Sequence, residues 1–113
     1  MLSIHYTEYP ERDIAKGSKY PYFSTARVVV DAMNEHGKEY FENTEILISN
    51  TEVIDYFRSL IRKGVYSHNE IQIVFFDEDT KTFHKNHFDE NAHIINEEAS
   101  PYDFGMKILS ELF

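Results

Sequence analysis

An Asp-x-Asp motif is the feature of this sequence that comes closest to a reactive site. Asp77 and Asp79 directly follow the apolar run of residues 70–76. Carboxylates at the carboxyl ends of parallel strands can hold Mg²⁺, because this ion takes oxygen ligands. The two aspartates are therefore candidate metal ligands. The alternative, which the sequence favours, is a solvent-exposed turn that closes a hairpin.

Histidines and serines give weaker signals. His84 and His87 are three residues apart in an expected strand, so their side chains point to opposite faces and do not share a metal. With His93 they are expected to be surface residues that respond to mildly acidic pH. The serines lack the Gly-x-Ser-x-Gly elbow of serine hydrolases, and we expect them in turns or helix caps: Ser49, Ser67 and Ser100.

Composition and charge exclude several kinds of site. The four glycines are isolated and form no phosphate-binding loop, so autonomous nucleotide hydrolysis is not expected. The absence of cysteine excludes disulfides, iron–sulfur clusters and zinc–thiolate sites. A net charge of −9, most of it in residues 66–113, disfavours binding to nucleic-acid phosphates. Three aromatic residues are expected in the core or at its rim rather than as a base-stacking platform: Tyr20, Tyr22 and Phe23.

The middle of the chain predicts a strand–helix–strand unit. Residues 45–49 form a short apolar run, and residues 51–63 repeat apolar side chains at helical spacing up to Gly64, a natural stop. Ser49, Asn50 or Thr51 can cap this helix. The apolar residues 70–76 then form a second strand, parallel to the first. We expect Phe57 to be buried against both strands and Arg58 to face solvent.

The remaining segments carry mixed signals. Residues 2–6 alternate like a strand, residues 8–21 contain two prolines and a glycine and predict a loop, and residues 82–88 predict an antiparallel strand. Residues 23–33 have helical spacing, although the β-branched run 27–30 also suits a strand. The polar residues 91–99 predict a loop. The last helix is expected to start at Ser100 with Pro101 at its first position and to bury three residues: Ile108, Leu109 and Leu112.

Together these elements predict an α/β fold in a single domain spanning residues 1–113. The expected architecture is a small, mainly parallel sheet of three to four strands packed against two to three helices. The N-terminus lacks the basic and apolar regions of a signal peptide, and no apolar run approaches the roughly 18 residues of a membrane helix. We therefore expect a cytoplasmic protein.

The order of several segments adds a resemblance. Residues 48–52 (Ile-Ser-Asn-Thr-Glu), 62–64 (Arg-Lys-Gly), 69–76 and 88–92 (Phe-Asp-Glu-Asn-Ala) follow one another at suggestive spacing. This order resembles the C-terminal lobe of ABC/SMC-like ATPases akin to the overcoming-lysogenization-defect group. In that lobe an H-loop strand, a helix, a Lys/Glu-Gly turn, an aromatic-ended strand and an Asp-Glu-Asn-Gly segment occur in sequence. The likeness covers roughly residues 45–92, and residues 7–11 (Thr-Glu-Tyr-Pro-Glu) faintly resemble the segment after Walker B.

Departures from this pattern define what the resemblance implies. Asn50 occupies the position of the H-loop histidine, so the γ-phosphate sensor is missing. Glu8 matches the magnesium carboxylate, whereas Tyr9 stands where many relatives have the catalytic acid. Walker A and the signature motif have no counterpart. The resemblance therefore implies a degenerate half-lobe that has lost hydrolysis and binds a partner.

The expected function is a non-catalytic protein-interaction module, an accessory or inhibitor of a larger ATPase or defence system. It is expected to bind a protein partner and no cofactor, nucleic acid or membrane. One alternative is a magnesium-dependent, toprim-like nuclease or phosphotransfer domain that uses Glu8, Asp77 and Asp79. Another is an acidic inhibitor that imitates nucleic acid.

Overall fold

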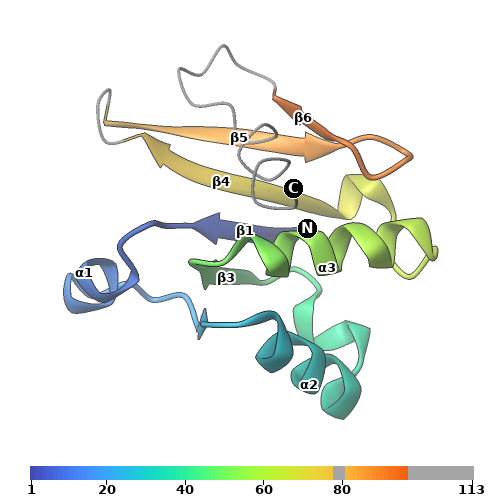
Figure 1. The fold of residues 1–113 in the computed structure, drawn as a ribbon, viewed down its shortest axis with the longest axis horizontal. Coiled ribbons are helices and arrows are strands. Elements are labelled where there is room, and N and C mark those ends of the chain that lie inside the picture. Colours follow the sequence, from blue (N-terminus) through green and yellow to red (C-terminus); the bar gives the residue numbers. More distant parts are fainter. Residues whose placement is uncertain (78–80, 97–113) are drawn as a thin grey trace.

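The computed structural model describes residues 1–77 and 81–96, which form one mixed six-stranded sheet with three α-helices (Figure 1). The strands are β1 (Leu2–Tyr6), β2 (Tyr22–Phe23), β3 (Glu45–Ile48), β4 (Ile71–Asp77), β5 (Thr82–Phe88) and β6 (Ile94–Asn96). The helices are α1 (Pro10–Ala15), α2 (Ala26–His36) and α3 (Thr51–Arg62), with 3₁₀ turns at Lys38–Phe41 and His68–Glu70. The predicted α/β class is confirmed.

The strand order is β2-β3-β1-β4-β5-β6. The first four strands in this order are parallel, and β5 and β6 extend the sheet by antiparallel pairing. The predicted sheet of three to four mainly parallel strands was therefore too small. Two-residue β2 and three-residue β6 are too short to show a periodic pattern, so sequence reasoning missed both.

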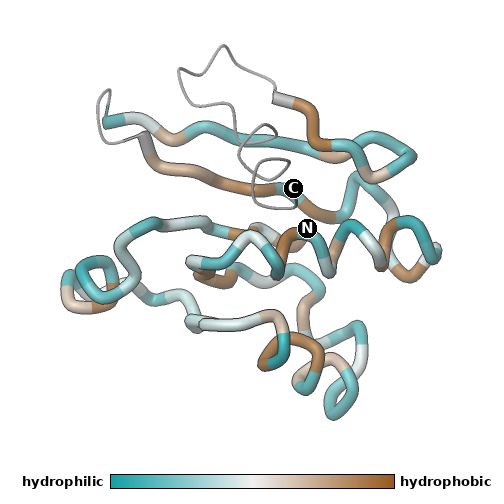
Figure 2. The backbone as a smooth tube through the Cα atoms, viewed as in Figure 1, coloured by the Kyte–Doolittle hydropathy of each residue, from teal (hydrophilic) through white to brown (hydrophobic). Residues whose placement is uncertain are grey.

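The core lies on one face of the sheet. Every second residue of the central strands points toward α2 and α3, and Ile4, Ile46 and Ile73 are fully buried there. Figure 1 shows α3 crossing the near face of the sheet with α2 below it, and Figure 2 shows β5 as largely hydrophilic. All buried apolar residues of α2 and α3 belong to this cluster, whereas α1 contributes none. The opposite face is built from the alternate residues: Ser3, His5, Leu47, Gln72, Val74 and Phe76.

The β3–α3–β4 unit confirms the strongest prediction. Phe57 is fully buried, and the Asn50 side chain caps the helix by accepting a hydrogen bond from the Glu52 backbone N–H at 2.8 Å. Both strands are parallel, but they are not neighbours, because β1 lies between them. The resemblance assigned Asn50 to the place of a phosphate sensor, and here its side chain holds the helix start.

Residues 8–21 are not the loop that was predicted, since they contain α1. Pro10 opens this helix, where a missing N–H costs nothing, and Glu11 and Asp13 lie in its first turn near the positive end of the helix dipole. Gly17, with φ +90, then turns the chain away from the helix. Six residues are too few to display a helical period, so the composition alone suggested a loop.

Residues 26–36 form the predicted helix α2 rather than a strand. The Thr25 hydroxyl caps its start by accepting from the Val28 N–H at 3.3 Å, and Gly37 ends it with φ +81. Val29 is its fully buried residue, whereas Phe23, which was expected on this helix, belongs to β2. Burial against the core outweighs the low helix propensity of the valines.

Arg58 does not face solvent as predicted. Its side chain is only 11% exposed, and its Nε donates to the backbone oxygen of Ala92 at 2.9 Å. Ala92 lies in the turn between β5 and β6, which is held by backbone N–H groups that donate to the Asp89 carboxylate. These hydrogen bonds, led by that from His93, lower the pKa of Asp89. Arg58 thus ties α3 to the antiparallel end of the sheet.

Two predictions concern the end of the chain. The loop expected at residues 91–99 was wrong for Ile94–Asn96, which pair with β5 as strand β6. The helix expected from Ser100 lies outside the described residues. Among the residues that are described, no helix is long and apolar enough to cross a membrane.

Candidate binding site at the carboxyl ends of β1 and β4

The site lies where the chain leaves two neighbouring parallel strands in opposite directions. From β1 the chain runs through α1 toward β2, on the β3 side of the sheet. From β4 it turns the other way, into β5. Open α/β sheets bind ligands in the crevice outside the carboxyl ends of such a strand pair. The topology therefore singles out the edge between β1 and β4.

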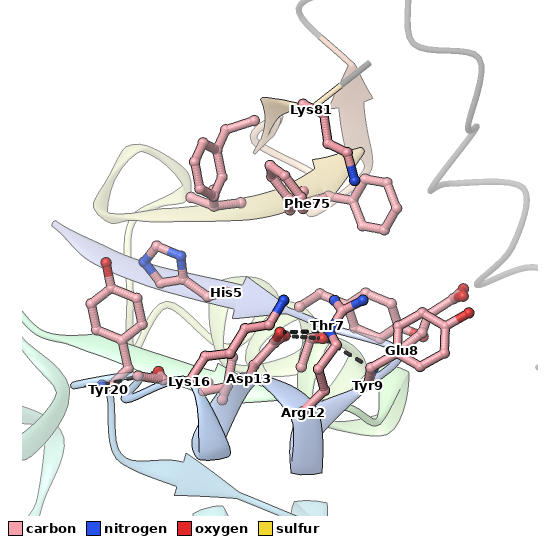
Figure 3. Close-up of a pocket in the computed structure, with 16 residues that line it drawn as sticks. His5, Thr7, Glu8, Tyr9, Arg12, Asp13, Lys16, Tyr20, Phe75 and Lys81 are labelled. Carbon is pink, nitrogen blue, oxygen red and sulfur yellow. Dashed lines mark hydrogen bonds and ion pairs between the residues drawn. The ribbon is translucent and has the colours of Figure 1, made fainter. Parts of the chain in front are cut away.

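A pocket of about 420 Å³ occupies this edge (Figure 3). Its volume lies in the range of small-molecule sites, which runs from about 300 to 1,000 Å³. Its walls come from the end of β1, from α1 and the segment after it, and from the facing ends of β4 and β5. Its polar lining residues are His5, Thr7, Glu8, Tyr9, Arg12, Asp13, Lys16, Ser18, Tyr20 and Lys81.

Thr7 holds α1 against the end of β1. Its backbone N–H donates to the oxygen of Ile48 at 2.9 Å, which extends the β1–β3 ladder by one residue. Its hydroxyl donates to the Asp13 carboxylate and accepts from the Tyr9 N–H at 3.0 Å. Both roles of the hydroxyl are thus filled by the protein itself. Thr7 and Asp13 shape the pocket, and sequence reasoning missed both because it treated this segment as a loop.

Arg12 lies beside the same carboxylate. Its Nε is 3.2 Å from Asp13 Oδ1, and its guanidinium carbon lies 4.7 Å from the centre of the Tyr9 ring. Guanidinium groups stack favourably on aromatic rings, so this contact orients Arg12 along the pocket wall.

His5 closes the opposite end of the pocket. Its ring stacks on Tyr20 with a centroid distance of 4.1 Å and an interplanar angle of 17°. Its Nε2 lies 3.1 Å from the Glu45 carboxylate on the neighbouring strand. Figure 3 shows His5 and Tyr20 at one end and Glu8 at the other. Tyr20 was expected in the core or at its rim, and the structure places it at the rim of the pocket.

Apolar side chains form the remaining wall. Phe76 and Phe83 face each other across the β4–β5 hairpin with ring centroids 5.0 Å apart. Leu47 and Val74 are almost fully buried on the same face, and Phe75 extends the wall at the end of β4. Phe83 itself is 63% exposed, although an aromatic residue of this size is usually covered. The wall therefore presents ring surface that a ligand can cover.

The weak candidate metal ligands are only partly brought together. Glu8 lines the pocket, and Asp77 ends β4, where its backbone pairs with Thr82. Asp79 lies outside the described residues. Within the described ranges, no three His, Asp or Glu side chains are grouped to hold a metal ion.

The predicted positions of the histidines and serines are confirmed in part, because His93 is exposed whereas His84 and His87 are half-buried. His84 pairs with Phe75 and His87 with Gln72, so these two side chains lie on opposite faces of β5 as predicted. His93 contacts the Asp89 carboxylate at 3.2 Å. Ser49 is hydrogen-bonded to the Tyr22 hydroxyl at 2.7 Å, and Ser67 caps a 3₁₀ turn. Ser100 lies outside the described residues.

Comparison with known proteins assigns no family. No protein-family model, no curated protein sequence and no solved structure matches the chain. The resemblance to the ATPase lobe stays a prediction. The geometry of the pocket is accordingly the basis on which function is argued.

Proposed function

We propose that the chain is a non-catalytic binding module and that the pocket between β1 and β4 is its binding site. The observation that carries this proposal is the position of a ligand-sized pocket at the point where the chain leaves the two strands in opposite directions. Strands supply its floor, and α1 with the segments beside it supplies the polar part of its wall.

The hydrogen bonds within the pocket support binding rather than catalysis. A nucleophile needs a neighbouring base that can take its proton, and Thr7 with Asp13 is the nearest such pair. The Thr7 hydroxyl also accepts the Tyr9 N–H, and Asp13 also contacts Arg12, so both groups serve to hold α1 in place. The His5 ring is stacked on Tyr20 and directed toward Glu45.

We also propose that the chain binds a protein partner, as expected from the sequence. Phe83 and Ile95 are 63% and 46% exposed and lie on the sheet face opposite the core. Exposed apolar side chains give a protein partner surface to bury. We propose that the partner contacts this face around Ile95 and that the exposed ring of Phe83 belongs to the ligand contact of the pocket.

The test is ligand mapping by NMR. A mixed set of fragment-sized aromatic acids, amines and neutral compounds is titrated into the ¹⁵N-labelled protein. We expect shift changes to concentrate at the backbone amides of Thr7, Lys16 and Phe83. Changes concentrated away from the pocket, or none at all, would contradict the proposal.

The non-catalytic part of the proposal has its own assay. ATP incubated with the protein and Mg²⁺ is expected to release no phosphate above the buffer rate, because the chain has no phosphate-binding loop. Phosphate release that disappears in Glu8→Gln would refute it.

A magnesium-dependent phosphotransfer or nuclease site is the second candidate, and one observation favours it. Tyr6 pairs with Phe75 on neighbouring parallel strands, and Glu8 and Asp77 each follow two residues later. Both backbones therefore reach the same edge of the sheet. Calorimetry with Mg²⁺ and Mn²⁺ separates the candidates. Micromolar affinity that is lost in Asp77→Asn would favour the metal site, whereas binding no tighter than millimolar would favour the binding module.

A further inference from the structure

We propose that the pocket takes a small aromatic anion, meaning a planar ring that carries one phosphate or carboxylate group. This inference rests on the proposed binding function and names the ligand class of the same site. It follows from the charge of the pocket, the placement of its cations and the nature of its wall.

The local charge of the pocket is opposite to that of the whole chain. Three cationic side chains line it, Arg12, Lys16 and Lys81, against two carboxylates, Glu8 and Asp13. Arg12 and Asp13 form an ion pair at 3.2 Å and offset each other, which leaves Lys16 and Lys81 against Glu8, a local balance of one positive charge. The chain as a whole carries a net charge of −9. A positive pocket on an acidic protein attracts a small anion over a short range only.

The cations are placed around the pocket rather than on one side of it. Lys16 reaches toward it from α1 and Lys81 from the turn that enters β5, so their ammonium groups approach from opposite sides (Figure 3). Lys81 has φ +57, a left-handed conformation that Gly or Asn usually adopts. Glycine and asparagine, which usually adopt this conformation, carry no charge, whereas Lys81 adds a positive charge at this point of the pocket. Two flexible ammonium groups suit one phosphate or carboxylate between them.

The wall beside these cations suits a ring. Phe76 and Phe83 pack at 5.0 Å, and the exposed part of Phe83 can be covered by a stacked ligand. Val74 lies beside them on β4, and Leu47 lines the pocket on the other side of His5. A ligand with a ring and an anionic group would contact both the aromatic wall and the two lysines. Inorganic phosphate would contact only the lysines.

The net charge also argues against a polymer as the source of the anion. A nucleic-acid strand carries many phosphates, which a surface of net charge −9 repels. A free small molecule presents one anionic group and meets only the local positive field. A nucleoside monophosphate and an aromatic carboxylic acid share the required chemistry.

The experiment uses the full chain and defined probes in calorimetric and NMR titrations. Phenyl phosphate, adenosine monophosphate and benzoate carry both a ring and an anion, whereas inorganic phosphate, benzyl alcohol and benzylamine do not. The tightest of the first three is expected to bind about tenfold more strongly than any of the second three. Benzyl alcohol and benzylamine lose a charge-assisted hydrogen bond, which corresponds to about one order of magnitude, and inorganic phosphate loses the contact with the aromatic wall. Which of the three is tightest identifies the source as nucleotide or aromatic acid.

Variants locate the anion. Lys16→Gln and Lys81→Gln are each expected to weaken the tightest probe by about fivefold to tenfold. Lys63→Gln is the matched control, because Lys63 is an exposed lysine at the carboxyl end of α3, and it should leave affinity unchanged. Urea midpoints of all three variants verify that the fold is intact.

Several results would overturn the inference. If benzyl alcohol or benzylamine binds as tightly as the best anionic probe, the negative charge does not select the ligand. If inorganic phosphate binds as tightly as that probe, the aromatic ring does not contribute to affinity. Equal affinity of wild type, Lys16→Gln and Lys81→Gln would also overturn it. If benzyl alcohol or benzylamine binds as tightly as the anionic probes, the pocket still binds a ligand, so the proposed function stands. If no fragment of any charge shifts the pocket amides, both fail.

Discussion

Arg58 is expected to contribute more to stability than Arg62, the other arginine of α3. Its Nε donates to the Ala92 oxygen at 2.9 Å, and its Nη1 lies 3.2 Å from the Asp55 carboxylate. A hydrogen bond from a charged donor contributes about 1.5–3 kcal/mol, whereas a partly exposed ion pair such as that with Asp55 adds under about 0.5 kcal/mol. Arg58→Ala should therefore lower the free energy of unfolding by about 2–3 kcal/mol.

The assay is urea denaturation followed by far-UV circular dichroism, since the chain has no tryptophan. Arg62→Ala is the matched control, because Arg62 is an exposed arginine in the last turn of the same helix, and its cost should stay within about 0.5 kcal/mol. Arg58→Lys keeps the charge but loses the planar fork, so it should fall between the two. Equal urea midpoints for Arg58→Ala and Arg62→Ala would refute the stabilising role of the Arg58–Ala92 hydrogen bond between α3 and the β5–β6 turn.

Three further predictions follow from burial and hydrogen bonding. Phe57→Ala should cost about 3–5 kcal/mol in urea denaturation because the ring is fully buried, and a neutral result would contradict the helix face. Thr7→Val should remove one of the two hydrogen bonds to the Asp13 carboxylate, leave the Tyr9 N–H without its partner and lower stability by about 1–3 kcal/mol. It should also weaken any pocket ligand in the same NMR titration, and unchanged affinity would show that the position of α1 does not matter to the site. Burial raises the pKa of Tyr66 to about 12, above its unfolded value of 10, so its stabilisation is complete below pH 10 and is lost as the pH rises toward 12. Urea denaturation should therefore show Tyr66→Phe less destabilised relative to wild type at pH 11 than at pH 8, and an equal difference at the two pH values would contradict the effect of burial.

Local periodicity was enough to predict α3 and the strands around it. Apolar residues recur along Val53–Ile61 at helical spacing, a capping residue precedes them and Gly64 follows. The same side chains that give the period also supply the burial that stabilises the helix, so local and tertiary preferences agree. The hairpin after β4 was predictable for the same reason, because a short polar turn joins two extended runs.

Short elements were not predictable because their stability comes from distant residues. Six-residue α1 is held by the Thr7 hydroxyl and by a proline at its start, and three-residue β6 exists only because β5 lies beside it. An isolated helix or strand of this length is unstable in water. Their sequences therefore carry no period to detect, and composition alone suggested loops.

Local patterns were enough to predict the α/β class, the central helix and the lack of a glycine-rich phosphate loop. The insertion of β1 between β3 and β4, which places the end of β1 beside the end of β4, could not be predicted from any local pattern. That insertion creates the pocket, because it brings Lys16 and Lys81, 65 positions apart in the chain, to one cavity. The position of β1 depends on how strand edges and buried faces fit across the whole sheet. This free energy comes from residues far apart in the chain, so no short segment of the sequence reveals it.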